Sequence, residues 1–447
     1  MFERDFLWGV ATASYQIEGA ILEDGKSLSI WDTFTHQKGN TYRNQNGDIA
    51  CDHYHRFKED VKLMKELGVD VYRFSVSWSR ILPNGTGKVN EKGIAFYSRL
   101  IDLLLENHIR PFMTLYHWDL PQCLEDKGGF IHPDFPLWFE EYTKVICQYF
   151  GDRVHDFITI NEPENCIYNG LGVGVMAPGK KLSVKDRLLA VHHILLAHGR
   201  AVKVIREQVK DSNIGFSACG WVPVPHPVTE ENLKAAYEQY FDLDKNRLGD
   251  GVAIWYDPIF LGKYPKRYES LYKENMPMIT KEDMELISQK IDFCGVNLYS
   301  GYYIKKENDR IIIENPSDRK AMDNGWSILE EVMYFSAKFL YYRYQKPIII
   351  TESGCADYAK VEDGHVHDQM RCKCLHSYLS WLEKAYHEGV DIRGYFHWSL
   401  LDNFEWERGY QPRFGLIYTD YAHHQKRIKK DSFYDYQTII QTSKRGC

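Results

Sequence analysis

Short runs of β-branched and aromatic residues recur along the chain, and amphipathic stretches of helical period separate most of them. The runs predicted to be strands are Phe6–Ser14, Val69–Trp78, Ile109–Trp118, Val154–Glu162, Asn213–Val222, Ile291–Ser300, Pro347–Gly354 and Ile392–Leu401. The stretches predicted to be helices are Tyr54–Leu67, Gly93–Asn107, Pro136–Phe150, Val184–Gln208, Glu330–Arg343 and Gln369–His387. This alternation favours an α/β fold, a single (β/α)8 TIM barrel with its active site at the C-terminal ends of the strands. A doubly wound parallel sheet is the alternative.

The two faces of the second predicted strand differ in character. Arg73, Ser75 and Ser77 share one face, whereas Tyr72 and Phe74 lie on the other. The apolar face suits a covering layer of helices, so the polar face should point into the barrel. Because a buried guanidinium is costly without an anion, we expect a carboxylate opposite Arg73.

The carboxyl ends of the predicted strands, where barrel enzymes place their catalytic groups, carry polar and aromatic residues. These ends read Tyr116-His117-Trp118-Asp119, Asn161-Glu162-Pro163, Asn297-Leu298-Tyr299, Thr351-Glu352-Ser353-Gly354 and His397-Trp398-Ser399. Glu162 and Glu352 follow apolar β-formers and should lie on nearly opposite sides of an eight-stranded ring. Two carboxyl groups facing each other suit glycoside hydrolysis, in which one protonates the leaving oxygen and the other attacks the anomeric carbon. A structural ion pair is the alternative.

Size, charge and cysteine usage narrow the range of functions. A chain of 447 residues could hold three domains, but (β/α)8 barrels reach more than about 400 residues, so we expect one domain over residues 1–447. The net charge of −7 lacks the basic footprint of a protein that binds nucleic acid or an anionic membrane. The 10 cysteines include no CxxC pair and no signal peptide is visible, so we expect reduced thiols and a cytoplasmic location.

Motifs for other chemistries fit poorly. The segment Gly19–Ser27 nearly matches a P-loop but has one residue too many between its glycines. Gly170, Gly172 and Gly174 lack the third spacing of a dinucleotide fingerprint, and neither HExxH nor GxSxG occurs. We therefore expect no cofactor and no metal.

Several motifs, in a characteristic order, resemble the glycoside hydrolase family 1 β-glucosidases of bacterial type over essentially the whole chain. The motifs are FLWGVATASYQIEGA, YRFSVSWSRILP, LYHWDLPQ, TINEP, ITESG, SLLDNFEWERGY and RFGLIYTDY. The resemblance implies that Glu162 is the general acid/base and that Glu352 is the nucleophile. The substrate-binding residues that it implies are Gln16, His117, Trp118, Asn161, Tyr299, Trp326, Trp398, Glu405 and Trp406. Support for the nucleophile would come from Arg73, Asn297 and Tyr299, which agrees with the anion expected opposite Arg73.

The resemblance implies a retaining β-glucosidase that removes terminal non-reducing β-D-glucosyl residues from small glycosides such as cellobiose. Activity on β-galactosides or β-fucosides is also expected. The expected partner is a small β-glycoside or oligosaccharide, and the oligomeric state, homo-oligomer included, stays open. The alternatives are a 6-phospho-β-glycosidase, against which Glu405 argues, a thioglucosidase, against which Glu162 argues, and a sugar-binding protein without activity.

The chain departs from the family pattern near the expected entrance. Ser353 follows the nucleophile where Asn is common, and Glu164 follows Asn-Glu-Pro where Trp is usual. Leu171, Val173 and Met176 stand where larger aromatic or His residues are frequent. We therefore predict a less aromatic and more acidic entrance, with an altered response to glucose or to longer oligosaccharides.

Overall fold

The computed structural model describes residues 2–3, 5–308 and 310–445, and a closed ring of parallel strands forms its centre. The ring runs in the order β1-β13-β10-β7-β5-β4-β3-β2, with every neighbouring pair parallel. The bounds are β1 Leu7–Ala11, β2 Val71–Ser75, β3 Arg110–Tyr116, β4 Asp156–Asn161, β5 Asn213–Cys219, β7 Phe293–Asn297, β10 Ile348–Ser353 and β13 Ile392–Trp398. Each strand lies inside a predicted run, so the predicted (β/α)8 barrel is confirmed and the doubly wound alternative is wrong.

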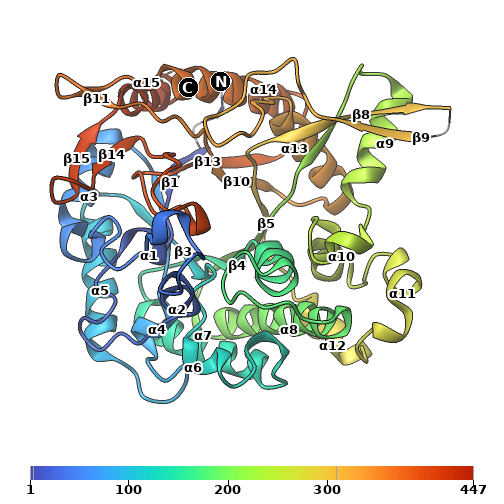
Figure 1. Ribbon diagram of the computed structural model, residues 1–447, viewed down its shortest axis with the longest axis horizontal. Coiled ribbons are helices and arrows are strands. Elements are labelled where there is room, and N and C mark those ends of the chain that lie inside the picture. Colours follow the sequence, from blue (N-terminus) through green and yellow to red (C-terminus); the bar gives the residue numbers. More distant parts are fainter. Residues whose placement is uncertain (1, 4, 309, 446–447) are drawn as a thin grey trace.

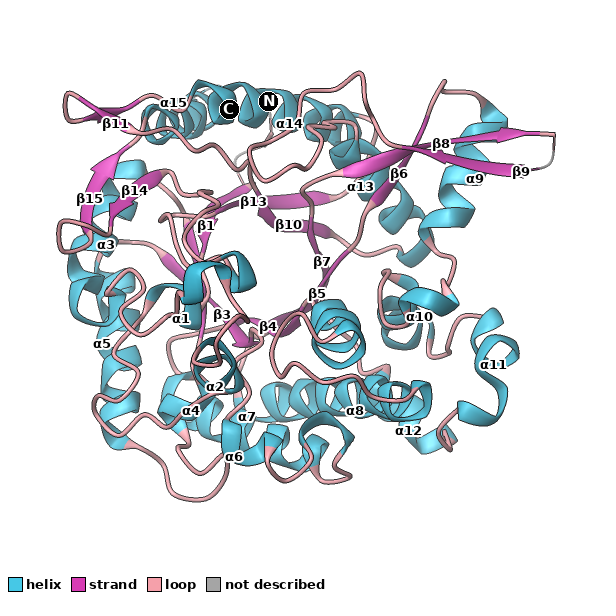
Figure 2. Ribbon diagram, in the orientation of Figure 1, coloured by secondary structure: helices cyan, strands magenta, loops and turns pink. Residues whose placement is uncertain are grey.

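Helices surround the barrel, as Figure 2 shows in cyan around the magenta strands. Those that match the predicted stretches are α3 His53–Leu67, α5 Glu91–Glu106, α7 Phe135–Phe150, α8 Val184–Gln208, α13 Val332–Tyr344 and α14 Gln369–His387. Their buried positions follow the helical period: α3 buries Phe57, Val61 and Met64, and Gly68 ends it in the left-handed conformation. The pattern therefore identified the helices that bury a regular apolar stripe against the barrel.

Other elements lie in the connections between the barrel strands. The helices are α1 Ser14–Ile17, α2 Ile30–Thr35, α4 Trp78–Ile81, α6 Gln122–Glu125, α9 Glu230–Tyr240, α10 Ala253–Leu261, α11 Arg267–Tyr272, α12 Lys281–Ile287 and α15 Asp431–Arg445. Strands β6 Val222–Pro225, β8 Gly301–Glu307 and β9 Arg310–Glu314 form a sheet that projects beside the barrel (Figure 1). Two hairpins complete the set, β11 Val361–Glu362 with β12 His365–Val366, and β14 Ile417–Asp420 with β15 Lys426–Lys429.

The buried hydrophobic side chains form one continuous cluster that extends from Phe2 to Ile440. This continuity supports the prediction of a single domain, which stays a prediction. Within the described residues, α8 alone is long and apolar enough to span a membrane, but 78% of its most apolar stretch is buried in the fold. We read it as a core helix.

Candidate active site

The two glutamates singled out in the sequence lie at the carboxyl ends of β4 and β10. Glu352 lies within β10, and Glu162 directly follows β4 with a backbone φ of 42°. Trp118 and Trp406 also have positive φ values, 75° and 55°. A positive φ is uncommon for bulky side chains, and all three residues lie at this end of the barrel.

Glu352 is buried beside a fixed positive charge. Its Oε1 accepts a hydrogen bond from Arg73 Nη1 at 2.6 Å, and its Oε2 accepts one from Tyr299 Oη at 2.7 Å. Arg73 is only 1% exposed, and it forms an ion pair with Glu352. Glu352 is therefore the carboxylate that we predicted opposite Arg73. Burial raises the pKa of Glu352, whereas the Arg73 charge and the Tyr299 hydroxyl oppose this rise and favour the ionised carboxylate.

Glu162 is also buried, but its carboxyl group receives only neutral donors. Asn297 Nδ2 donates to Oε1 at 2.6 Å, and Asn165 Nδ2 donates to Oε2 at 2.8 Å. Burial, followed by the charge of Glu352, raises the pKa of Glu162 to about 8. The two carboxyl groups therefore divide their roles near neutral pH, with the charge on Glu352 and the proton on Glu162.

Asn161 connects the nucleophile side of the site to His117. Its Oδ1 accepts hydrogen bonds from Arg73 Nη2 at 2.6 Å and Asn297 Nδ2 at 3.0 Å, which leaves its Nδ2 facing His117 Nε2 at 3.1 Å. Burial lowers the pKa of His117 well below its usual value, so the ring is neutral. The network assigns the ring proton to Nδ1, which has no partner among the described residues and can donate to a ligand.

A second group of predicted residues comes from the segment after β13. Trp398 Nε1 donates to Glu405 Oε1 at 3.4 Å, and burial raises the pKa of Glu405 to about 8. Gln16 Nε2 donates to Asn403 Oδ1 at 3.0 Å and to Phe404 O at 2.9 Å. Gln16 Oε1 is buried without a partner among the described residues, so an acceptor is available for a hydroxyl group.

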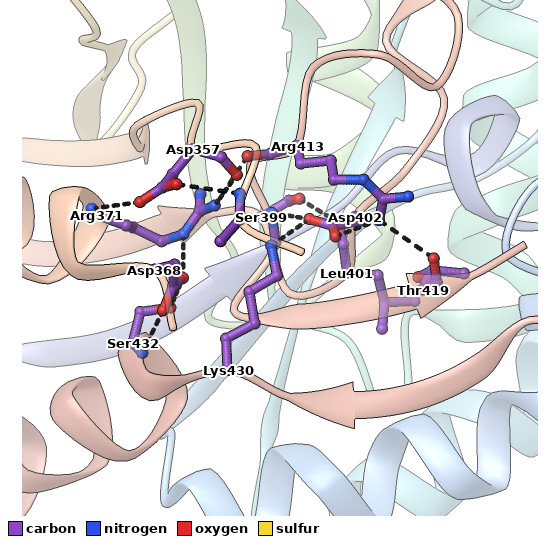
Figure 3. A network of polar contacts seen from close by, with 12 residues as sticks. Asp357, Asp368, Arg371, Ser399, Leu401, Asp402, Arg413, Thr419, Lys430 and Ser432 are labelled. Carbon is purple, nitrogen blue, oxygen red and sulfur yellow. Dashed lines mark hydrogen bonds and ion pairs between the residues drawn. The ribbon is translucent and has the colours of Figure 1, made fainter. Parts of the chain in front are cut away.

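Asp402, in the segment after β13, forms buried ion pairs that hold this segment in place (Figure 3). Asp402 accepts hydrogen bonds from Lys430 Nζ at 2.7 Å and from Arg413 Nη1 at 2.7 Å. Lys430 and Asp402 have no exposed side-chain surface, and burial lowers the pKa of Lys430 to about 8. The pair fixes the chain three residues before Glu405.

A neighbouring pair holds the segment that follows Glu352. Arg371 Nε donates to Asp368 Oδ2 at 2.7 Å, and Arg371 Nη1 donates to the carbonyl oxygen of Cys355. Arg371 Nη2 also donates to the carbonyl oxygen of Arg413 at 2.9 Å, which joins the two pairs. The strand-end loops of β10 and β13 therefore rest on one polar network.

A cavity opens at this end of the barrel, and most of the predicted site residues line it. The predicted residues in its wall are His117, Trp118, Glu162, Asn297, Tyr299, Trp326, Glu352, Trp398, Glu405 and Trp406. Arg73 and Asn161 lie behind the wall, where Arg73 binds Glu352 and Asn161 contacts His117 and Asn297, and Gln16 binds the segment just before Glu405. The structure therefore brings the whole predicted set to one place.

Other residues of the wall were not predicted. They include Asn165, Tyr168, Asn169, Trp221, Arg247, Asp250, Asn324 and Phe414. Asn165, Tyr168 and Asn169 belong to the π-helical segment Asn165–Val173, a rare conformation that is found at functional sites. Asn169 Nδ2 donates to Asn165 Oδ1 at 2.6 Å, and the four-residue spacing of these two asparagines just after Asn-Glu-Pro was the only signal that the sequence offered.

The predicted character of the entrance is wrong at Glu164. This side chain is only 2% exposed and accepts a hydrogen bond from Cys219 N at 3.0 Å, so it points away from the cavity. Of the other departing positions, Met176 lines the cavity, Leu171 is buried and Val173 lies outside the wall. Trp221, in the connection between β5 and β6, also lines the cavity.

Paired carboxyl groups of unequal charge at the mouth of a closed barrel, facing indole rings, are the arrangement of a glycoside hydrolase. The chain belongs to glycosyl hydrolase family 1, whose family model matches residues 1–445. It is 46% identical to beta-glucosidase A of Thermotoga maritima over 99% of this chain and 98% of that protein. It is 45% identical to a 1,4-beta-D-glucan glucohydrolase of Thermotoga neapolitana over 99% of this chain and 98% of that protein. A solved structure of the Thermotoga maritima beta-glucosidase in complex with glucoimidazole matches with a TM-score of 0.91, 45% identity and 99% coverage of both chains.

Proposed function

We propose that the protein is a retaining β-glucosidase that removes terminal β-D-glucosyl residues from small glycosides such as cellobiose. The contrast between the two carboxyl groups carries the proposal. Glu352 binds a guanidinium and a hydroxyl donor, whereas Glu162 has neutral amide donors and a pKa of about 8. Relatives named as β-glucosidases over nearly the full chain support the same activity.

In the first step, the Glu352 carboxylate attacks the anomeric carbon while Glu162 gives its proton to the leaving glycosidic oxygen. The bond from the anomeric carbon to that oxygen breaks as the bond to Glu352 forms. Esterification removes the charge of Glu352, which is one cause of the raised pKa of Glu162. Glu162 then takes a proton from water, whose oxygen displaces Glu352 and restores the original anomeric configuration.

The remaining groups suit a neutral glucosyl ring. The faces of Trp398 and Trp406 can stack against the C–H side of a sugar, while Glu405, Gln16 and His117 offer hydroxyl-binding atoms. Glu405 supplies no positive charge that could hold a phosphate group, so we favour an unphosphorylated substrate. We extend the proposal to β-galactosides and β-fucosides, because these neutral sugars differ from glucose at single hydroxyl positions and can share most contacts of this kind.

Azide as an external nucleophile tests the two roles separately. The Glu352→Gly variant, given azide and an activated aryl β-glucoside, should form the α-glucosyl azide, because azide attacks where the carboxylate is missing. The Glu162→Ala variant should form the β-glucosyl azide, because its covalent intermediate still forms. Glu238→Gln, an exposed position on α9, is the control and should form neither. Inversion of configuration by the native protein, or exchange of the two azide products, would overturn the assignment.

We also propose a cytoplasmic location. All nine cysteines in the described part of the chain are free thiols, which suits a reducing compartment. Fractionation of the source cells should recover the protein in the soluble cytoplasmic fraction. Recovery outside that fraction would contradict the proposal.

A further inference from the structure

Glu164 is a buried carboxyl group that takes no part in the proposed reaction. It stands two positions after the acid/base Glu162 and directly before Asn165, the first residue of the π-helical segment. Its side chain lies outside the wall of the cavity, so it does not touch a substrate there. Because a carboxyl group is costly to bury, its place so close to the acid/base indicates a role for its hydrogen bond.

The carboxyl group of Glu164 extends the hydrogen bonding between β4 and β5 beyond the end of β4. The two strands are parallel neighbours, and Glu162 N still donates to Ser217 O at 2.8 Å. Glu164 has left the strand and has helical backbone angles, with φ −49° and ψ −48°. Two residues after Ser217, Cys219 N donates to Glu164 Oε1 at 3.0 Å. The side chain therefore stands in for a strand carbonyl where β4 has ended.

This link lies between the two amide groups that hold Glu162. Asn165 Nδ2, next to Glu164 in the chain, donates to Glu162 Oε2 at 2.8 Å and lies 3.9 Å from Cys219 Sγ. On the other side, Cys219 pairs in register with Asn297 of β7. Asn297 Nδ2 donates to Glu162 Oε1 at 2.6 Å. The hydrogen bond to Glu164 thus ties the segment that carries one donor to the strand beside the other.

A neutral carboxyl group suits this position. Burial, followed by the charge of Glu162, raises the pKa of Glu164 well above its ordinary value, so Glu164 keeps its proton. Since Oε1 accepts from Cys219 N, the proton is assigned to Oε2. The group therefore adds no negative charge near Glu162 when Glu162 takes a proton from water.

We propose that Glu164 is a positioning residue for acid catalysis, holding Asn165 and the end of β5 so that Glu162 stays directed at the leaving oxygen. The proposal rests on the β-glucosidase function, in which Glu162 protonates that oxygen. Glu164 acts through the position of Glu162 and has no chemical step of its own. Its loss should therefore weaken protonation of the leaving group more than attack by Glu352.

Two aryl β-glucosides that differ in their leaving groups test this role. Phenyl β-glucoside needs a proton on its leaving oxygen, whereas dinitrophenyl β-glucoside does not. Glu164→Leu removes the acceptor and should lower kcat/KM for the phenyl substrate about tenfold or more, but for the dinitrophenyl substrate less than about twofold. Glu164→Gln keeps an acceptor and should recover most of the loss. Glu238→Leu, at an exposed position on α9, is the control and should change neither value.

Two further variants keep the test independent of packing at this position. Glu164→Ala also lacks an acceptor and should show the same selective loss, with denaturant unfolding to establish that each variant is folded. Asn165→Ala removes the donor itself. Combined with Glu164→Leu, it should cost less than the product of the two single losses, because both act on one carboxyl group.

The outcomes separate this role from the proposed function. If the native protein hydrolyses neither glucoside, the β-glucosidase function fails and the role of Glu164 fails with it. If the native protein hydrolyses both, an equal loss on the two substrates in Glu164→Leu, or no recovery in Glu164→Gln, would overturn only the positioning role.

Discussion

At the scale of single residues, the hydrogen-bond donors around Glu162 and Glu352 give these two carboxyl groups different protonation states. A guanidinium within 2.6 Å makes Glu352 the better place for a negative charge, whereas amide donors leave Glu162 dominated by burial and by its charged neighbour. Because the reaction needs Glu352 ionised and Glu162 protonated at the same time, activity should depend on both pKa values.

The pH profile of kcat/KM for an aryl β-glucoside with a poor leaving group should therefore be bell-shaped. Glu162 acts while protonated, so activity should fall as pH rises through about 8. Glu352 acts while ionised, and its raised pKa should place the acidic limb above pH 4.5. In Glu162→Gln, assayed with a leaving group that needs no proton, the basic limb should vanish. Its persistence would assign that limb to another group.

Arg73→Met should lower kcat/KM by about a hundredfold or more, because the nucleophile loses its cation and a buried carboxylate is left unpaired. The acidic limb of the pH profile should also move to higher pH. Tyr299→Phe keeps the cation and should cause a smaller shift. A loss of activity with an unmoved acidic limb would reduce Arg73 to a structural role.

At the scale of elements, hydrophobic periodicity predicted the barrel strands and six flanking helices, because each buries a regular stripe against a neighbour. Three helices between β5 and β7 were missed, since α10, α11 and α12 have 9, 6 and 7 residues and show little repeated pattern. In α15, the signal was present and overlooked: Phe433, Tyr436 and Ile440 are buried at helical spacing. Trp221 falls inside the predicted run Asn213–Val222, but β5 ends at Cys219, so its place in the connection that lines the cavity required the three-dimensional fold.

The network beneath the β13 loop gives a prediction at this scale. Lys430→Met leaves Asp402 buried with one cation fewer and should lower the free energy of unfolding by about 3 kcal/mol. Because Asp402 lies three residues before Glu405, the change should also displace the loop after β13 and raise KM for an aryl β-glucoside. Lys429→Met is the matched control, since Lys429 pairs with the exposed Glu66 and its loss should cost less than about 1 kcal/mol. Denaturant unfolding measures both, and equal costs would contradict the supporting role of Lys430.

At the scale of the whole molecule, barrel closure assembles a site from residues far apart in the chain. Arg73 and Glu352 are separated by 279 positions, and Asn161 and Asn297 by 136. Strand alternation was sufficient to predict that Arg73 points inward toward an anion. It could not show which way Glu164 points, because a residue just past a strand end is oriented by its loop, here by the contact with Cys219 N. Alternation therefore predicts the orientation of site residues on strands, whereas Trp326, Glu405 and Trp406, which lie outside the strands, were predicted only through the family resemblance.

Assembling several carboxyl groups in one buried site should make the stability of the entire fold depend on pH. Glu162 and Glu405 both have a pKa of about 8 when folded, against 4.5 for an ordinary glutamate. Between these values, the folded protein holds protons that the unfolded chain has released, so the free energy of unfolding should fall as pH rises from 4.5 to about 8.

Glu162→Gln, which carries no charge at any pH, should flatten that slope and stabilise the fold above pH 8 by about 2 kcal/mol or more, while abolishing most activity. Denaturant unfolding of the native protein and the variant across this pH range measures the difference. Glu238→Gln, at its exposed position on α9, should leave the slope unchanged. Parallel pH dependences for Glu162→Gln and the native protein would show that Glu162 is not the buried proton holder, because removing such a group must change the number of protons released on unfolding.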